Sequence, residues 1–268
     1  MRQLTNLTAL IMLLLILPGC GDKKSRSSET NDPYLWLEEV DAERSLDWAR
    51  EQNKLSDEVL TVRPEFTELK ERFLEVLNDE ERIIYPGIVG EMSYNLWQDE
   101  KNERGLWRRM SKEDYLAGKD VWETVLDLDL LSAEDGKKWV FGGATWLGPE
   151  NRYCMLHLSD GGKDESFIRE FDAVEKKFVG GGFSIPESKG SVAWVNRDQI
   201  LVATNYGPGT MTSSGYPAVA KLWNRGEDPA NAVTVHRTDT ANMGVFVNGG
   251  EVNGKQYVFL SENVGFYE

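Results

Sequence analysis

The amino-acid sequence predicts a mainly β protein, a partial β-propeller of about three to four blades that follows a short N-terminal helical segment. Short runs of alternating apolar and polar residues, separated by glycine, asparagine and aspartate, extend from Met92 to the end of the chain. These runs repeat weakly at roughly 40–50 residues, the length of one four-stranded blade. Before them, apolar residues recur at helical spacing between Arg44 and Leu77.

The composition is that of a globular, acidic protein. Of the 268 residues, 40% are hydrophobic and 28% are charged, and the formal net charge is −15. A protein that binds nucleic acid needs lysine and arginine to neutralise phosphates. We therefore expect no nucleic-acid partner, and we interpret the acidic side chains as a solvated surface.

The first 20 residues resemble the signal peptide of a bacterial lipoprotein. Residues 4–17 are mostly apolar, a length suited to a signal-peptide core and too short for a comfortable membrane span. The sequence Leu17-Pro18-Gly19-Cys20 follows and is similar to a lipobox, in which the cysteine becomes acylated. We expect Cys20 to anchor an exported protein in a bacterial envelope through lipid alone, in the periplasm or at the outer membrane. The alternative is a plain secretory signal with an incidental cysteine.

The rest of the chain divides into three expected parts. Residues 21–31 are polar, rich in serine and without apolar side chains, which predicts a flexible tether. Residues 32–80 form the helical segment. Residues 81–268 form the partial propeller, and the last residues resemble a sheet protein interrupted within a strand.

Two helices are expected between residues 32 and 80. The first runs from Arg44 to about Val59, with Asp41 as a plausible cap. The second begins at Pro64, because proline fits the first turn of a helix. Four residues at helical spacing give this second helix one apolar face: Phe66, Leu69, Phe73 and Leu77.

Strands and turns alternate in the remaining sequence. Expected strands include Leu106–Met110, Glu123–Leu128 and Ile200–Thr204, with turns at 160–162, 180–182 and 253–254. Trp146, Trp194 and Phe246 occur at similar places in successive repeats, which favours propeller blades over the alternative of an all-β sandwich with chance tryptophan spacing. Cys154 shares a predicted strand face with Leu156 and Leu158. Because Cys20 would be lipidated, Cys154 has no disulfide partner, and we interpret it as a buried structural thiol.

No group of residues in the sequence forms a recognisable catalytic, cofactor or metal site. A hydrolase nucleophile of the Gly-x-Ser-x-Gly type is absent, and neither Ser184 nor Ser214 has that setting. The two histidines, His157 and His236, lie in strand-like runs and are interpreted as structural or surface residues. Asp127 and Asp129 would share a solvated strand face without the other ligands of a calcium loop. Residues 180–182 lack the lysine and helix of a phosphate-binding loop.

Motifs in order along the chain resemble the prolyl oligopeptidase family of serine peptidases. The likeness extends from Asp32 to about Gly226 and includes YNLWQDEKNERGLW at 94–107 and SSGYP at 213–217. Other matching segments are 32–39, Arg108, 122–123, 126–128, 158–162 with Asp164, 169–172, 182–183, 186–189, Trp223 and 225–226. No single motif is specific, but their order and number are.

The resemblance implies an N-terminal segment and the first half of a seven-bladed propeller, which would cover the active site of a C-terminal α/β-hydrolase domain. It also implies a serine-type oligopeptidase or endopeptidase that cleaves short proline-containing peptides and needs no cofactor. The catalytic domain is missing from this chain, so the resemblance assigns no catalytic residue, and we expect the chain alone to be inactive and poorly soluble. The expected partners are short peptides and the missing hydrolase domain. The alternative is a non-catalytic, propeller-type binding lipoprotein.

Overall fold

The computed structural model describes residues 32–39 and 41–267. The chain divides into two compact units between Lys70 and Glu71, inside the second helix. The predicted signal peptide, Cys20 and the tether lie outside the described residues. Within the described part of the chain, no helix has the length and apolarity to cross a membrane.

Both predicted helices are present. A 3-10 helix, η1 (Leu35–Glu38), precedes α1 (Glu43–Leu60), and α2 (Pro64–Asn78) begins at the predicted proline. The prediction of Asp41 as cap is wrong, because Ala42 holds the N-cap position and no side chain caps the helix. The Ala42 carbonyl instead accepts hydrogen bonds from the amides of Ser45 (2.9 Å) and Leu46 (3.0 Å).

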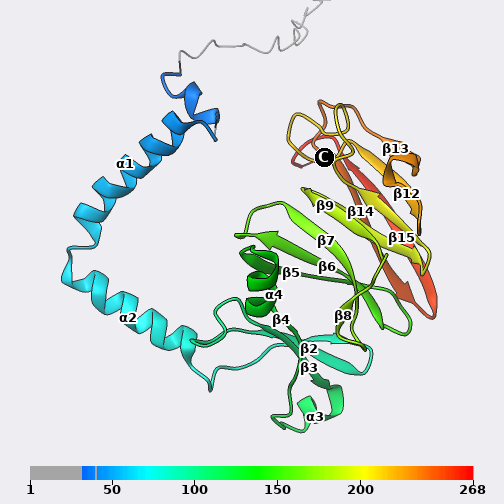
Figure 1. Cartoon of the computed structure of the whole chain (residues 1–268), viewed down its shortest axis with the longest axis horizontal. Coiled ribbons are helices and arrows are strands. Elements are labelled where there is room, and N and C mark those ends of the chain that lie inside the picture. Colours follow the sequence, from blue (N-terminus) through cyan, green and yellow to red (C-terminus); the bar gives the residue numbers. More distant parts are fainter. Residues whose placement is uncertain (1–31, 40, 268) are drawn as a thin grey trace, which may run out of the picture. The chain divides into compact units, whose positions relative to one another are not determined.

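The described residues of the second unit form four antiparallel sheets, which follow one another in chain order (Figure 1). Sheet 1 contains β1 (Gly87–Val89), β2 (Met92–Trp97), β3 (Leu106–Ser111) and β4 (Glu123–Asp127). Sheet 2 contains β5 (Trp139–Trp146), β6 (Tyr153–Asp160), β7 (Ser166–Asp172), β8 (Lys177–Phe178) and β9 (Ser184–Ser188). Sheet 3 contains β10 (Ser191–Asn196), β11 (Gln199–Ala203), β12 (Val219–Asn224) and β13 (Val233–Arg237). Sheet 4 contains β14 (Gly244–Val252) and β15 (Lys255–Asn263).

The predicted repeat corresponds to the start of each sheet after the first. Trp146 lies in β5, Trp194 in β10 and Phe246 in β14, and each of these strands is the first of its sheet. Three sheets have four or five strands and the fourth has two. The prediction of a partial propeller with three blades and part of a fourth is therefore confirmed.

The short helices lie within or beside the blades. They are α3 (Lys112–Leu116), α4 (Leu128–Asp135) and the 3-10 helix η2 (Pro229–Asn231). The predicted strand at 123–128 ends at Asp127, whose side chain accepts a hydrogen bond from the Leu130 amide (2.9 Å) and caps α4. Asp127 and Asp129 therefore do not share a strand face, and that prediction is wrong.

The core lies between consecutive sheets. Tyr94 and Trp107 of sheet 1 pack against Leu156 and Phe171 of sheet 2. Other clusters join Met155 and Ile168 of sheet 2 to Trp194 and Ile200 of sheet 3, and Ala193 and Leu201 of sheet 3 to Val245 and Val247 of sheet 4. Both faces of β6 are buried, since neighbouring residues point to opposite faces of a strand. Burial between neighbouring sheets therefore joins each blade to the next.

Candidate functional site

The first strands of all four sheets border one cavity of about 460 Å³. Val89 of β1, Thr145 of β5, Val192 of β10 and Asn248 of β14 each contribute to its wall. We call this space the central cavity. Its described lining residues include four glycines and the polar side chains of Thr145, Asn151, Asn248 and Glu251.

An aromatic cluster supports one side of the central cavity. The Tyr94 ring lies 5.2 Å from Trp107 and 4.8 Å from Trp146, measured between ring centroids. Trp146 lines the central cavity and also borders an adjoining hollow of about 220 Å³. Tyr94 and Trp107 come from the 94–107 motif and line the adjoining hollow, where both rings pack against Trp146. The aromatic residues of this motif therefore support the cavity wall from behind.

The polar residues of the same motif fix the loop between β2 and β3. The Trp97 indole donates to Asp99 Oδ2 (2.7 Å), and the other Asp99 oxygen accepts from the amides of Lys101 and Asn102 (both 2.9 Å). The hydrogen bond from Trp97 is the main cause that lowers the pKa of Asp99. Asp129 accepts hydrogen bonds from the Arg104 amide (3.1 Å), at the other end of the loop.

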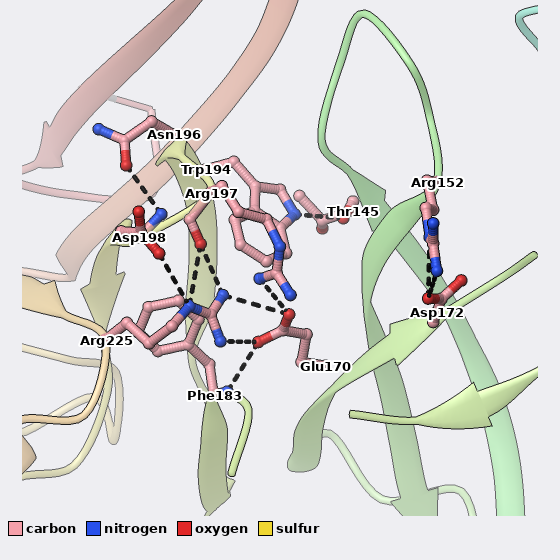
Figure 2. A network of polar contacts seen from close by, with 10 residues as sticks. All are labelled: Thr145, Arg152, Glu170, Asp172, Phe183, Trp194, Asn196, Arg197, Asp198 and Arg225. Atoms are coloured by element: carbon pink, nitrogen blue, oxygen red, sulfur yellow. Dashed lines mark hydrogen bonds and ion pairs between the residues drawn. The ribbon is translucent and has the colours of Figure 1, made fainter. Parts of the chain in front are cut away.

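A buried carboxylate connects sheets 2 and 3 (Figure 2). Glu170 of β7 is only 1% exposed. Its Oε2 accepts hydrogen bonds from Arg225 Nη1 and from the Phe183 amide (both 2.9 Å), and its Oε1 pairs with Arg197 Nη1. Burial raises the pKa of Glu170, while the Phe183 amide and the positive charge of Arg197 oppose that rise. We call Glu170, Arg197 and Arg225 the inter-sheet ion cluster.

Neighbouring contacts complete this connection. The Trp194 indole donates to the Thr145 carbonyl (2.9 Å), joining sheet 3 to the cavity-lining end of β5. A Cβ atom on Gly182 would lie 2.8 Å from Glu170 Oε2, so the position excludes larger residues. The inter-sheet ion cluster thus joins two consecutive blades, of which β5 and β10 line the central cavity.

The candidate nucleophiles and histidines do not come together. Cys154 is fully buried, and burial raises the pKa of its thiol well above the usual value, which agrees with a structural role. His157 Nε2 lies 3.0 Å from Thr145 Oγ1, and His236 Nε2 lies 2.6 Å from Glu262 Oε2. Within residues 32–39 and 41–267, neither histidine hydrogen-bonds to a serine, and no cluster of three or more His, Cys, Asp or Glu could hold a metal ion.

The sequence interpretation missed the contacts of three charged residues. In the sequence, Glu170 and Arg225 belong to longer motifs, and no pattern marks Arg197. One signal was available: Glu170 occupies the same strand face as the apolar Ile168, so burial of its carboxylate follows from alternation along β7. Its partners lie 27 and 55 positions later in the chain, so strand alternation alone does not identify them.

Comparison with known proteins places this architecture in a family. Residues 22–263 match the family model described as prolyl oligopeptidase, N-terminal beta-propeller domain. An uncharacterised peptidase of Sinorhizobium fredii, y4nA, is 39% identical over 251 residues, covering 90% of this chain and 35% of the relative. An uncharacterised peptidase of Rickettsia prowazekii, RP174, is 35% identical over 226 residues, covering 80% of this chain and 31% of the relative.

A solved structure shows the same relationship. A post-proline cleaving enzyme from Rickettsia typhi superposes with a TM-score of 0.77 at 29% identity, covering 87% of this chain and 35% of that one. The chain thus spans about a third of the length of the relatives it matches. From its ordered blades and these matches, the chain belongs to the prolyl oligopeptidase family, in which it corresponds to the N-terminal propeller region.

Proposed function

We propose that this chain is the N-terminal part of an exported serine peptidase of the prolyl oligopeptidase type, which hydrolyses short proline-containing peptides. The observation that carries the proposal is the central cavity, bordered by the first strands of all four sheets. The names of the relatives support it: two are called peptidases, and the Rickettsia typhi protein is called a post-proline cleaving enzyme.

In this proposal the propeller controls which substrates reach the catalytic domain. A peptide in extended conformation could enter a space bordered by the first strands, whereas a folded protein could not. The inter-sheet ion cluster and the aromatic cluster would keep that opening narrow, because they fix consecutive blades against each other. Acylation of a serine by the peptide, followed by hydrolysis, would take place in a further domain.

The test compares two proteins. One is the purified 268-residue chain, and the other is the product of the longest reading frame that contains this chain. Both are assayed on a fluorogenic peptide that reports cleavage after proline. We expect hydrolysis only from a longer product that carries a Gly-x-Ser-x-Gly segment, with loss of activity on replacement of that serine. Two results would contradict the proposal. One is hydrolysis by the 268-residue chain itself that a serine-directed inhibitor abolishes, and the other is an inactive longer product. An inactive product that still bound peptide would favour a non-catalytic binding protein.

The envelope location is a separate proposal. The lipobox-like sequence ending at Cys20 supports acylation of that cysteine, and two or more acyl chains would give stable anchoring. Metabolic labelling with an alkyne fatty acid should tag the protein and place it in the membrane fraction. Cys20→Ser should abolish both the tag and the membrane association, and Cys154→Ser should leave them unchanged.

A further inference from the structure

Among the described residues, one ionisable side chain lines the central cavity. Among the described residues that line it, Glu251 is the only acid, and none is lysine, arginine or histidine. The uncharged polar side chains are those of Thr145, Asn151 and Asn248. Within the described lining, a single negative charge thus faces the cavity.

The Glu251 side chain is held in place at the end of β14. Its Oε1 accepts a hydrogen bond from the Gly254 amide in the turn that follows. The loop after β5 packs directly on it, since a Cβ atom added to Gly148 would lie only 2.4 Å from Glu251 Cβ. The carboxylate is therefore oriented before any ligand arrives.

The second carboxylate oxygen remains available. Glu251 takes part in no ion pair with the described residues, and its Oε2 accepts no hydrogen bond from them. None of the described residues that line the cavity carries a positive charge that would offset that of Glu251, so its field acts on whatever enters the cleft. The half-buried carboxylate should therefore attract a cation more strongly than a carboxylate on an open surface would.

Trp146 adds a second source of attraction. Its indole lines the same cavity, and the face of an indole ring favours cations. Glu251 would repel anionic groups, and none of the described lining residues offers them a positive charge. We therefore expect the cavity to favour cationic over anionic ligands.

We propose that Glu251 forms a binding site for the primary ammonium group of a peptide, either its amino terminus or a lysine side chain. The inference rests on the proposed passage of peptides through the propeller and adds a preference among them. Glu251 would select substrates at the propeller, before they reach any catalytic residue.

The experiment measures equilibrium binding to the full 268-residue chain by isothermal titration calorimetry. Three amidated probes are compared: glycyl-prolyl-alanine, its N-acetyl form, and N-acetyl-glycyl-prolyl-lysine. We expect at least one of the two ammonium-bearing probes to bind about tenfold more tightly than the neutral acetylated one, a ratio typical of a single favourable charge contact. The preference for the ammonium-bearing probe should shrink when the salt concentration rises from about 0.02 to about 0.5 M, because dissolved ions screen the charge of Glu251.

The variant Glu251→Gln tests the residue. Its amide oxygen can still accept the Gly254 amide, so the turn should be kept while the charge is lost. In this variant we expect the ammonium-bearing and acetylated probes to bind with affinities that differ by less than about twofold. Glu134→Gln is the matched control, because Glu134 is exposed on α4 and does not line the cavity.

Each outcome decides the inference. A preference for the terminal ammonium alone, or for the lysine probe alone, supports the site and identifies the source of the cation. Equal binding of all probes, absence of binding, or a preference that survives Glu251→Gln would overturn it. Because binding is measured without hydrolysis, the inference can fail while a longer product cleaves proline peptides, and it can hold if that product is inactive.

Discussion

Glu170 combines complete burial with several charged neighbours. Its carboxylate has no exposed surface, whereas the Arg197 and Arg225 side chains are 35% and 23% exposed. Ion pairs between partly solvated arginines and a buried acid contribute little net stability relative to apolar packing, but loss of one partner is costly. The residue therefore determines how sheets 2 and 3 fit together more than it adds to overall stability.

The variant Glu170→Ala should lower the free energy of unfolding by about 3 kcal/mol, because two guanidinium groups and the Phe183 amide each lose a buried acceptor. Urea denaturation followed by tryptophan fluorescence measures the change. Asp198→Ala is the control: Asp198 pairs with the same Arg225 but is 76% exposed, and its loss should cost less than about 1 kcal/mol. Equal effects of the two substitutions would show that burial of the cluster is unimportant.

His157 should make stability depend on pH. Burial lowers the pKa of His157 below its usual 6.5. The unfolded chain then takes up a proton near pH 6.5 while the folded chain stays neutral, so this contribution is complete above about pH 6.5 and declines as the pH falls. The unfolding free energy of wild-type protein should drop more between pH 7.5 and 5.5 than that of His157→Gln. If the unfolding free energies of the two proteins changed equally with pH, His157 would not be the cause of the pH dependence.

Among the elements, the β14–β15 hairpin depends on its two-residue turn. Asn253 and Gly254 both have positive φ, 54° and 75°, as expected for the turn that suits the twist of a hairpin. The two strands pair continuously from Gly244 with Asn263 to Val252 with Lys255. This turn also carries the amide that orients Glu251.

Gly254→Ala should lower the free energy of unfolding by about 1 kcal/mol, because a Cβ atom disfavours the left-handed conformation at this position. Gly250→Ala, on the same hairpin, is a matched control. No atom lies within 4 Å of a Cβ atom at Gly250 and its φ is not positive, so its effect should be neutral or slightly stabilising. Thermal unfolding of both variants checks the difference, and similar losses would exclude turn strain as the cause.

Short-range sequence patterns predicted the elements whose conformation depends on residues close together in the chain. Alternation along β6 predicted the buried face with Cys154, Leu156 and Leu158, and Pro64 predicted the start of α2. The switch from strand to helix at Leu128 was missed because it depends on one side-chain cap, that of Asp127. The central cavity also escaped prediction, since its wall combines residues from four separate strands.

For the whole molecule, the two-stranded sheet 4 leaves β15 as an edge strand that can pair with another chain. Among the described strands, β15 pairs only with β14, and Tyr257 and Phe259 on one of its faces are 41% and 63% exposed. Long apolar edge strands promote association between chains. The edge strand β13 has only five residues, so it offers fewer backbone groups for pairing with another chain.

The isolated chain should therefore self-associate with increasing concentration, and Phe259→Lys should reduce this. A lysine on an exposed edge strand opposes pairing with another chain. Sedimentation velocity at several concentrations measures the weight-average mass. Val233→Lys on β13 introduces the same charge at a position that is 61% exposed, and we expect it to have a smaller effect. A monomeric wild-type chain at all concentrations would contradict the prediction.

The buried thiol of Cys154 offers a direct way to follow motion in the propeller. Its side chain lies between sheets 1 and 2, among Tyr94, Trp107 and Phe171, and has no exposed surface. A thiol reagent can therefore modify it only while these two blades separate. In a Cys20→Ser background, the modification rate would report how often the blades open, and a bound peptide that holds them together should slow that rate.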